Sequence, residues 1–283
     1  MSKVKEYMQS PVYVVDKEEP VQRARNLMLK HDISRLLVMD KGKLAGVVTN
    51  HDISNRLSQA APEWRRRPIS MIPIKLVMTD CPITIYPDAT LQQAAEIMEE
   101  NDIDGLPVER NGEIEGIITS RDLIAYFAER VEDLVGDLMS RNVVVVHRHH
   151  TIDHILDEMN TRGVDRVVVS EDNVTPVGVV THTNLAITGL TDPKDEVKTK
   201  NIKMARKDST AGRKQYRYIK EMPLVAEDIM SYPIIFTNPK IKASEAAKIL
   251  IEKDICGLPV VDDDKIVGFF STREIVSAVR GWS

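Results

Sequence analysis

Hydrophobic and polar positions follow one succession of spacings that occurs four times along the chain. A short apolar stretch rich in valine, such as residues 12–15 or 143–146, precedes a segment whose apolar residues recur at i, i+3, i+4 and i+7. The first pattern is typical of a strand, and the second of a helix with one buried face. The helical spacing is weaker in the first copy, where Arg25 occupies an apolar position. It is complete in the other copies at Leu91, Ala94, Ala95 and Met98, at Ile152, Ile155, Leu156 and Met159, and at Ala243, Ala246, Ala247 and Leu250.

Two more apolar runs follow each helix, and a polar turn such as Lys41-Gly42 or Asn111-Gly112 separates them, which predicts a hairpin. Each unit therefore has the order β-α-β-β-α, a mixed α+β arrangement. The second strands are expected at residues 36–39, 106–108, 167–169 and 258–261, and the third strands begin at Gly46, Gly116, Gly178 and Gly268. Every unit starts with a short lead-in that ends in a methionine, which is Met8, Met78, Met139 or Met230.

A polar motif follows the third strand of every copy. After the glycine come two apolar residues, a hydroxyl side chain, two variable positions and a carboxylate or amide. At the start of a helix this spacing forms a capping box, which is a purely structural explanation. A helix N-terminus with free N–H groups is also an anion site, so four equivalent ligand clefts are the functional alternative. The four pairs are Thr49 with Asp52, Thr119 with Asp122, Thr181 with Asn184, and Ser271 with Glu274.

Composition agrees with several small modules. The chain has 283 residues, of which 42% are hydrophobic, and its net charge of -5 argues against a general nucleic-acid binder. No apolar run approaches the roughly 18 residues of a membrane span, and the first residues lack a secretory signal, so we expect a cytoplasmic protein without membrane contact. Cys81 and Cys256 form no Cys-x-x-Cys, which predicts neither a disulfide nor a zinc site. Because the phosphate-binding and nucleophile motifs of common enzymes are missing from the sequence, we expect no enzymatic activity.

The repeated unit and its motif resemble the CBS domain, named for cystathionine β-synthase. Four copies in one chain are similar to the two tandem pairs, or Bateman modules, of archaeal four-repeat CBS proteins and of the gamma subunit of AMP-activated protein kinase. The resemblance implies that the two modules form a flat disc with pseudo-symmetry. The expected repeats are residues 1–57, 74–128, 134–190 and 223–281, with a linker at 58–73 and a basic linker at 191–222.

In CBS proteins that bind nucleotides, the hydroxyl of the motif contacts phosphate and the acid accepts hydrogen bonds from the two ribose hydroxyls. The resemblance therefore implies an adenine-nucleotide sensor for AMP, with ADP and ATP competing, whose occupancy regulates an unidentified partner protein. Its strongest ligands are expected to be Thr49, Asp52, Thr119 and Asp122. Thr181 and Ser271 keep the hydroxyl, but Asn184 has one carbonyl acceptor and Glu274 is one methylene too long to hold the same geometry without movement. We expect those two sites to be weaker, altered or empty.

One arginine recurs near the motif in each copy. In the first and third copies it directly precedes the second strand, at the place where the kinase gamma subunit has arginines that contact phosphate. The second and fourth copies have Gly105 and Gly257 at that position and carry an arginine inside the motif instead. A guanidinium close to a helix N-terminus can hold phosphate oxygens in pairs. The four candidates are Arg35, Arg166, Arg121 and Arg273.

Histidines offer a weaker signal. His51 and His182 lie inside the motif, and we expect both to be solvent-exposed loop residues. The cluster of His147, His149, His150 and His154 has irregular ligand spacing, so no metal site is expected.

The linkers leave alternatives open. Between residues 191 and 223, ten Lys and Arg stand against five acids, which favours a solvated connector over a docking segment. In the first linker Trp64 precedes three arginines, and its packing against a repeat is favoured over contact with nucleic acid. One rival function is a CBS module for S-adenosylmethionine or methylthioadenosine. Another is an interaction protein whose basic linker binds nucleic acid or an enzyme. A homodimer stays open as well.

Overall fold

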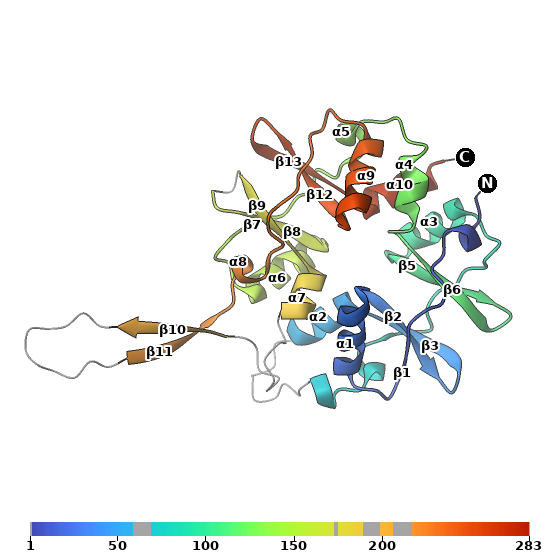
Figure 1. Ribbon diagram of the computed structural model, residues 1–283, viewed down its shortest axis with the longest axis horizontal. Coiled ribbons are helices and arrows are strands. Elements are labelled where there is room, and N and C mark those ends of the chain that lie inside the picture. Colours follow the sequence, from blue (N-terminus) through green and yellow to red (C-terminus); the bar gives the residue numbers. More distant parts are fainter. Residues whose placement is uncertain (1, 59–68, 173–174, 189–198, 206–216, 283) are drawn as a thin grey trace, which may run out of the picture.

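Four β-α-β-β-α units lie around a common centre in the computed structural model, which describes residues 2–58, 69–172, 175–188, 199–205 and 217–282 (Figure 1). Figure 1 views the molecule down its shortest axis, and in this view the four units surround the centre of a disc. The α+β class and the four-unit disc agree with the prediction. The first unit follows the 3-10 helix η1 (Val4–Glu6) and contains β1 (Val14–Asp16), α1 (Val21–His31), β2 (Arg35–Asp40), β3 (Lys43–Thr49) and α2 (Asn50–Ser58).

The other units repeat this order. The second follows η3 (Ile69–Met71) and contains η4 (Ile74–Leu76), β4 (Thr79–Asp80), α3 (Leu91–Glu100), β5 (Gly105–Arg110), β6 (Glu113–Thr119) and α4 (Leu123–Ala128). The third contains α5 (Val135–Leu138), β7 (Val145–His147), α6 (Ile152–Arg162), β8 (Arg166–Ser170), β9 (Pro176–Thr181) and α7 (His182–Thr188). The fourth contains α8 (Ala226–Ile229), α9 (Ala243–Lys253), β12 (Gly257–Asp262), β13 (Lys265–Ser271) and α10 (Thr272–Arg280).

The predicted hairpins are confirmed. Strands β2 and β3 pair antiparallel, as do β5 with β6 and β12 with β13. At the first turn Lys41 and Gly42 have φ of 51° and 80°, and at the second Asn111 and Gly112 have φ of 55° and 86°. Two successive residues with positive φ are what a two-residue hairpin turn requires, and Asn-Gly suits it best.

The first strand of each unit is shorter than the sequence predicts. β1 and β7 cover three residues each, beginning at Val14 and Val145. In the second and fourth units the same place holds single parallel bridges, Ile85 to Val108 and Thr237 to Val260. The residue before each of these two short strands still accepts a backbone hydrogen bond within its own unit, from Leu37 N to the oxygen of Tyr13 and from Val168 N to the oxygen of Val144.

Lead-ins are exchanged within two pairs of units. The pairings join Thr79 to Val47, Gln9 to Ile117, Ser231 to Val179, and Ser140 to Phe269. The first and second units therefore form one module, named here the first module, and the third and fourth units form the second module. The recurring glycine faces the exchanged methionine in every case, as in Gly116 with Met8 and Gly178 with Met230. One contact thus explains why both residues recur in the sequence.

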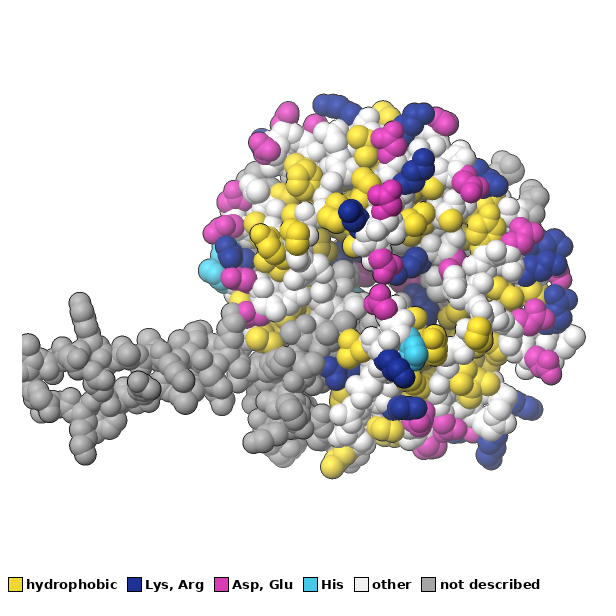
Figure 2. All heavy atoms as spheres, in the orientation of Figure 1, with side chains coloured by type: hydrophobic (Ala, Val, Ile, Leu, Met, Phe, Trp, Pro, Cys, Tyr) yellow, Lys and Arg dark blue, Asp and Glu magenta, His cyan; other side chains and the backbone are white. Residues whose placement is uncertain are grey.

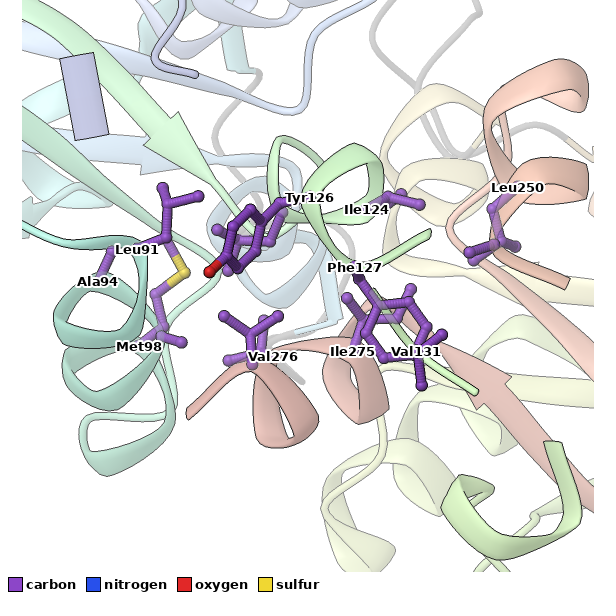
Figure 3. Packing of buried hydrophobic residues seen from close by; sticks show 14 of the residues in the cluster. Leu91, Ala94, Met98, Ile124, Tyr126, Phe127, Val131, Leu250, Ile275 and Val276 are labelled. Atoms are coloured by element: carbon purple, nitrogen blue, oxygen red, sulfur yellow. The ribbon is translucent and has the colours of Figure 1, made fainter. Parts of the chain in front are cut away.

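Helices join the two modules, and the two sides of the joint differ. On one side α2 packs against α7, whereas on the other α10 packs against α3 and α4 packs against α9. The second and fourth units share one continuous apolar core, in which Phe127 lies among Val131 and Ile275 (Figure 3). The first and third units have separate cores. The pseudo-symmetric disc is therefore held by a shared core on one side only.

A hairpin projects from the disc within the basic linker (Figure 1). Its strands β10 (Thr199–Ala205) and β11 (Arg217–Pro223) pair antiparallel from Thr199 with Pro223 to Ala205 with Arg217. The rest of this linker lies outside the described residues, and so do Trp64 and the arginines that follow it.

Candidate functional site

The hydroxyl and the acid of the motif bond to each other in each unit. Asp52 Oδ2 accepts hydrogen bonds from the backbone N and the Oγ1 of Thr49, both at 2.7 Å. Asp122 Oδ2 accepts the same two bonds from Thr119 at 2.7 Å, and Asn184 Oδ1 accepts them from Thr181 at 2.9 Å. This is capping-box chemistry at the start of the closing helix. It uses one oxygen of each carboxylate and leaves Oδ1 of Asp52 and Asp122 for other donors.

Glu274 holds the same geometry as the shorter acids. Its Oε2 accepts from the backbone N of Ser271 at 2.8 Å and from Ser271 Oγ at 2.6 Å. These bonds agree with the capping box expected in every copy, and the longer side chain folds back over the first turn to make them. The expectation that the extra methylene alters the geometry concerns the ribose, which these bonds do not involve. Whether Glu274 also serves a ribose stays a prediction.

A polar residue from the exchanged lead-in meets the acid of the motif. Gln9 Nε2 donates to Asp122 Oδ1 at 2.8 Å, and Asn184 Nδ2 donates to Ser231 Oγ at 3.2 Å. Sequence reasoning missed these residues. The signal was available, because the residue directly after the lead-in methionine is polar in every copy, as in Gln9, Thr79, Ser140 and Ser231.

Arg35 and Arg166 reach across their modules and lie over the glycines at the equivalent positions. A methyl group at Gly105 would overlap Arg35 Nη1, and one at Gly257 would lie 2.6 Å from Arg166 Nη1. The glycines of the second and fourth copies are therefore the space that the arginines of the first and third copies occupy. Arginine and glycine therefore alternate in the sequence because the arginine of one repeat packs on the glycine of the paired repeat.

The two arginines differ in their partners. Arg166 donates through Nε and Nη2 to Asp165 at 2.9 and 2.6 Å, and through Nη1 to the carbonyl oxygen of Cys256 at 2.9 Å. Burial alone would raise the pKa of Asp165, but this ion pair holds it well below its usual range. Arg35 has a distant pair with Asp104, at 3.9 Å, and its buried Nε has no hydrogen-bond partner among the described residues. Burial lowers the pKa of Arg35, and Asp104 offsets this in part.

Arg121 and Arg273 reach toward the opposite module. Arg121 Nη1 contacts Asp254 Oδ1 at 2.6 Å, and Arg273 Nη2 contacts Asp102 Oδ1 at 2.9 Å. The two ion pairs are reciprocal, since each aspartate follows the first helix of the unit that carries the other arginine. Arg121 Nη2 also donates to Cys256 Sγ at 3.1 Å. Each guanidinium is therefore already bound to an acid of the opposite module.

His182 is buried, which corrects the expectation of an exposed loop residue. The residue is the first of α7 and is 7% exposed. Nδ1 lies 2.8 Å from Ser54 Oγ, and the ring meets His51 at 4.2 Å between centroids. Burial, reinforced by His51, lowers the pKa of His182 to about 4. His51 is exposed as expected, but it lies on α2 rather than in a loop.

The motif of the fourth unit lines a cavity of about 100 Å³. The opposite wall comes from the third unit and includes Asn142, Val144, Asp165 and Arg166. We call this the second-module site. Its equivalent around Gln9, Arg35, Thr119 and Asp122 is the first-module site. Basic and acidic side chains gather near the centre of the disc face in Figure 2, where the units meet.

Two other features bear on function. Within the described part of the chain, no group of three or more His, Cys, Asp and Glu residues is arranged to hold a metal ion, and the rings of His150 and His154 contact each other at 4.3 Å. In the same part, no helix has the length and apolar character needed to cross a membrane.

Known proteins share this sequence and fold. An uncharacterized protein of Methanocaldococcus jannaschii is 26% identical over 282 residues, which cover 98% of this chain and 61% of the relative. An inosine-5′-monophosphate dehydrogenase of Korarchaeum cryptofilum is 36% identical over 113 residues, which cover 40% of this chain and 21% of that enzyme. The alignments with these relatives thus span less than two thirds of their lengths.

A solved structure resembles the whole disc. It is a Methanocaldococcus jannaschii protein described as a proposed archaeal homolog of γ-AMPK, with a TM-score of 0.80, 19% identity and coverage of 98% of this chain and 99% of that one. At this identity the likeness shows the fold alone. A model of the CBS domain matches residues 4–59, 74–129, 135–187 and 225–281, which together make up most of the sequence. The chain therefore belongs to the CBS domain family.

Proposed function

We propose that this protein is a regulatory adenine-nucleotide sensor, which binds AMP, with ADP and ATP in competition, between paired repeats and transmits occupancy to a partner protein. The observation that supports this most is the combination of Asp122 and Arg35 in the first-module site. They lie close enough for their charges to interact. A buried guanidinium with an unused donor is costly, and an anion that accepts from it would remove that cost.

The chemistry of a nucleoside monophosphate fits this pair. A carboxylate offers acceptors to both hydroxyls of a ribose, and Asp122 Oδ1 becomes available if Gln9 moves aside. Arg35 then stands ready for a phosphate, to which guanidinium groups bind in a bidentate manner. In the first unit, Asp52 Oδ1 accepts no hydrogen bond from the described residues, although burial raises the pKa of this carboxyl.

Ligand binding would require movement, which gives the sensor its output. The second-module site encloses about 100 Å³, whereas sites for small molecules usually hold at least about 300 Å³. Its walls include Phe269 and Arg273, and Arg273 is bound to Asp102 of the opposite module. A ligand that displaces Arg273 would weaken a contact between the modules. Coupling of this kind needs a different ligand affinity in the two arrangements.

The test is calorimetric titration of the folded protein, stripped of bound nucleotide, with AMP, ATP and S-adenosylmethionine. Asp122→Ala removes the ribose acceptors, so we expect about 10 to 100-fold weaker AMP binding at this site. Asp157→Ala, on the exposed face of α6, removes the same charge away from both sites and should leave the affinity unchanged. Equal affinity of Asp122→Ala and the unsubstituted protein would reduce Asp122 to a helix cap and contradict the proposal.

A second ligand class keeps the ribose but lacks the phosphate. S-adenosylmethionine and methylthioadenosine could use Asp122 without Arg35. Competition between methylthioadenosine and AMP separates the two classes: displacement of AMP at equal concentration would show that the phosphate adds little.

A further inference from the structure

The two modules place equivalent arginines in different electrostatic states. Arg166 uses Nε, Nη1 and Nη2 in hydrogen bonds to Asp165 and to the carbonyl of Cys256. Its guanidinium also lies over the ring of Phe269, 5.3 Å from the centroid. Among the described residues, Arg35 has neither an adjacent acid nor a bidentate partner, and the nearest carboxylate in that part of the chain is 3.9 Å away on Asp104. The second-module site thus contains a closed ion pair, whereas the first-module site contains an open cation.

Two sequence differences account for this. The residue before Arg166 is Asp165, whereas the residue before Arg35 is Ser34. In the second unit Asp104 precedes Gly105, but Cys256 stands at the equivalent place in the fourth unit. Asp104 is 56% exposed and is therefore screened by water, while the side chain of Asp165 is 34% exposed and touches Arg166 at 2.6 Å. The compensation is strong in one module and weak in the other.

The rest of the second-module site adds no open cation. Its charged lining residues within the described chain are Asp165, Arg166, Arg273 and Glu274. Arg273 is held by Asp102 at 2.9 Å. A phosphate that entered would meet Glu274 and would have to compete with Asp165 for both edges of Arg166. Like-charge contact and loss of a bidentate pair both oppose an anion here.

We propose that Asp165 is a specificity-determining residue that closes the second-module site to phosphorylated nucleosides, so that this site takes adenosine derivatives without a 5′ phosphate and the first-module site takes nucleoside monophosphates. The inference deepens the proposed function and rests on it. One chain would then bind a phosphorylated and an unphosphorylated adenosine compound at the same time, because the equivalent positions Ser34 and Asp165 differ in charge.

The test is a reciprocal exchange of the two residues. Asp165→Ser gives the second module the residue found before Arg35, and Ser34→Asp gives the first module the residue found before Arg166. Equilibrium dialysis with radiolabelled AMP and with adenosine measures the number of sites for each. We expect Asp165→Ser to bind AMP at one more site, the second-module site. The AMP affinity of that site should rise at least about 10-fold, because Arg166 regains a free bidentate edge. Ser34→Asp should lose AMP affinity about 10-fold at the first-module site while adenosine binding elsewhere is unchanged.

Matched controls separate charge from position. Asp157→Ser removes the same charge from an exposed position on α6 and should leave both site counts unchanged. Circular dichroism and thermal melting establish that each variant is folded. Because Ser34 is exposed, Ser34→Asp keeps the exchange informative even if Asp165→Ser does not fold.

The outcomes distinguish the inference from the function on which it rests. If the unsubstituted protein binds no AMP, the proposed function is wrong. Suppose that AMP binds, and that Glu274→Ala or Ser271→Ala as a single substitution removes one of the AMP sites. Phosphate then already enters the second module, and the inference is overturned. The same conclusion follows if folded Asp165→Ser keeps the original AMP stoichiometry and folded Ser34→Asp keeps the original affinity.

Discussion

Single residues in this protein acquire their chemical state from chain segments far away in sequence. Asp122 is met by Gln9, and Arg121 by Asp254. The motif pairs could be predicted from the sequence because hydroxyl and acid stand three residues apart. The partners of Arg121 and Arg273 could not, because they lie more than a hundred residues away and depend on how the modules meet. For the same reason the burial of His182 was missed, since the residues that cover it belong to the first unit.

The lowered pKa of His182 predicts how the stability of the protein depends on pH. Its folded pKa of about 4 lies below the ordinary value of 6.5, so the neutral ring is favoured by the fold. That contribution is fully present above pH 6.5 and is lost as the pH falls toward 4, because the unfolded chain takes up the proton first. With each pKa unit worth about 1.4 kcal/mol, the contribution at neutral pH is about 3 kcal/mol at most.

Urea unfolding at pH 7 and pH 4.5 measures this effect. The loss of unfolding free energy between the two pH values should be larger in the unsubstituted protein than in His182→Gln, which cannot titrate. His149→Gln, at a side chain that is 67% exposed, serves as the control and should keep the full loss. A raised pKa at Asp52 acts in the opposite direction, and it is common to all three proteins. Equal pH dependence in His182→Gln and the unsubstituted protein would contradict the assignment.

Among the elements, hairpins and helices followed local rules and could be predicted, whereas the lead-ins could not. Asn111-Gly112 fixes its turn within two residues, and the apolar spacing of α3 is complete within eight. The lead-in methionine and the recurring glycine are both visible in the sequence, but their contact joins different units. Periodicity within one repeat contains no information on which repeat it pairs with.

The contact between glycine and methionine can be tested with a double substitution. A Cβ at Gly178 would meet only side-chain atoms of Met230 among its three nearest neighbours, with Sδ at 2.5 Å. We expect Gly178→Ala to destabilise the protein by about 1 to 3 kcal/mol through overpacking. Adding Met230→Ala should recover part of that loss, so the two changes should be non-additive in chemical unfolding.

The first unit supplies the contrast. A Cβ at Gly46 would lie 2.7 Å from the backbone oxygen of Thr79 as well as 2.9 Å from Met78 Sδ. Because a backbone carbonyl cannot be trimmed, Met78→Ala should not rescue Gly46→Ala. Rescue at neither position would show that the methionine does not decide the cost, and rescue at both would show that the carbonyl of Thr79 does not decide it at Gly46.

Across the whole molecule, the four units are similar but the two sides of the joint between the modules differ. The sequence predicted four similar units and a pseudo-symmetric disc, and both are present. It did not predict that α4, α3, α9 and α10 would merge two units into one core while α2 and α7 meet through polar groups. The difference lies in a few large side chains, since Phe127 packs on Trp282 at 5.7 Å between ring centroids, and Ser54 and His182 stand on the other side.

This asymmetry predicts where the disc opens first. Local stability follows apolar burial, so amides of α2 and α7 should exchange with deuterium faster than those of α3, α9 and α10. The joint between α2 and α7 has polar contacts such as Asn50 to Thr183 at 3.3 Å, which water can replace. Phe127→Ala should cost about 3 to 5 kcal/mol and should speed exchange in α3 and α10, because it leaves a cavity in the shared core. Tyr232→Ala, at an aromatic residue that is 76% exposed, is the control and should leave the pattern unchanged. Equal protection of α2, α7, α3 and α10 in the unsubstituted protein would mean that the two sides open together, and a ligand that displaces Arg273 would then have no softer side through which to act.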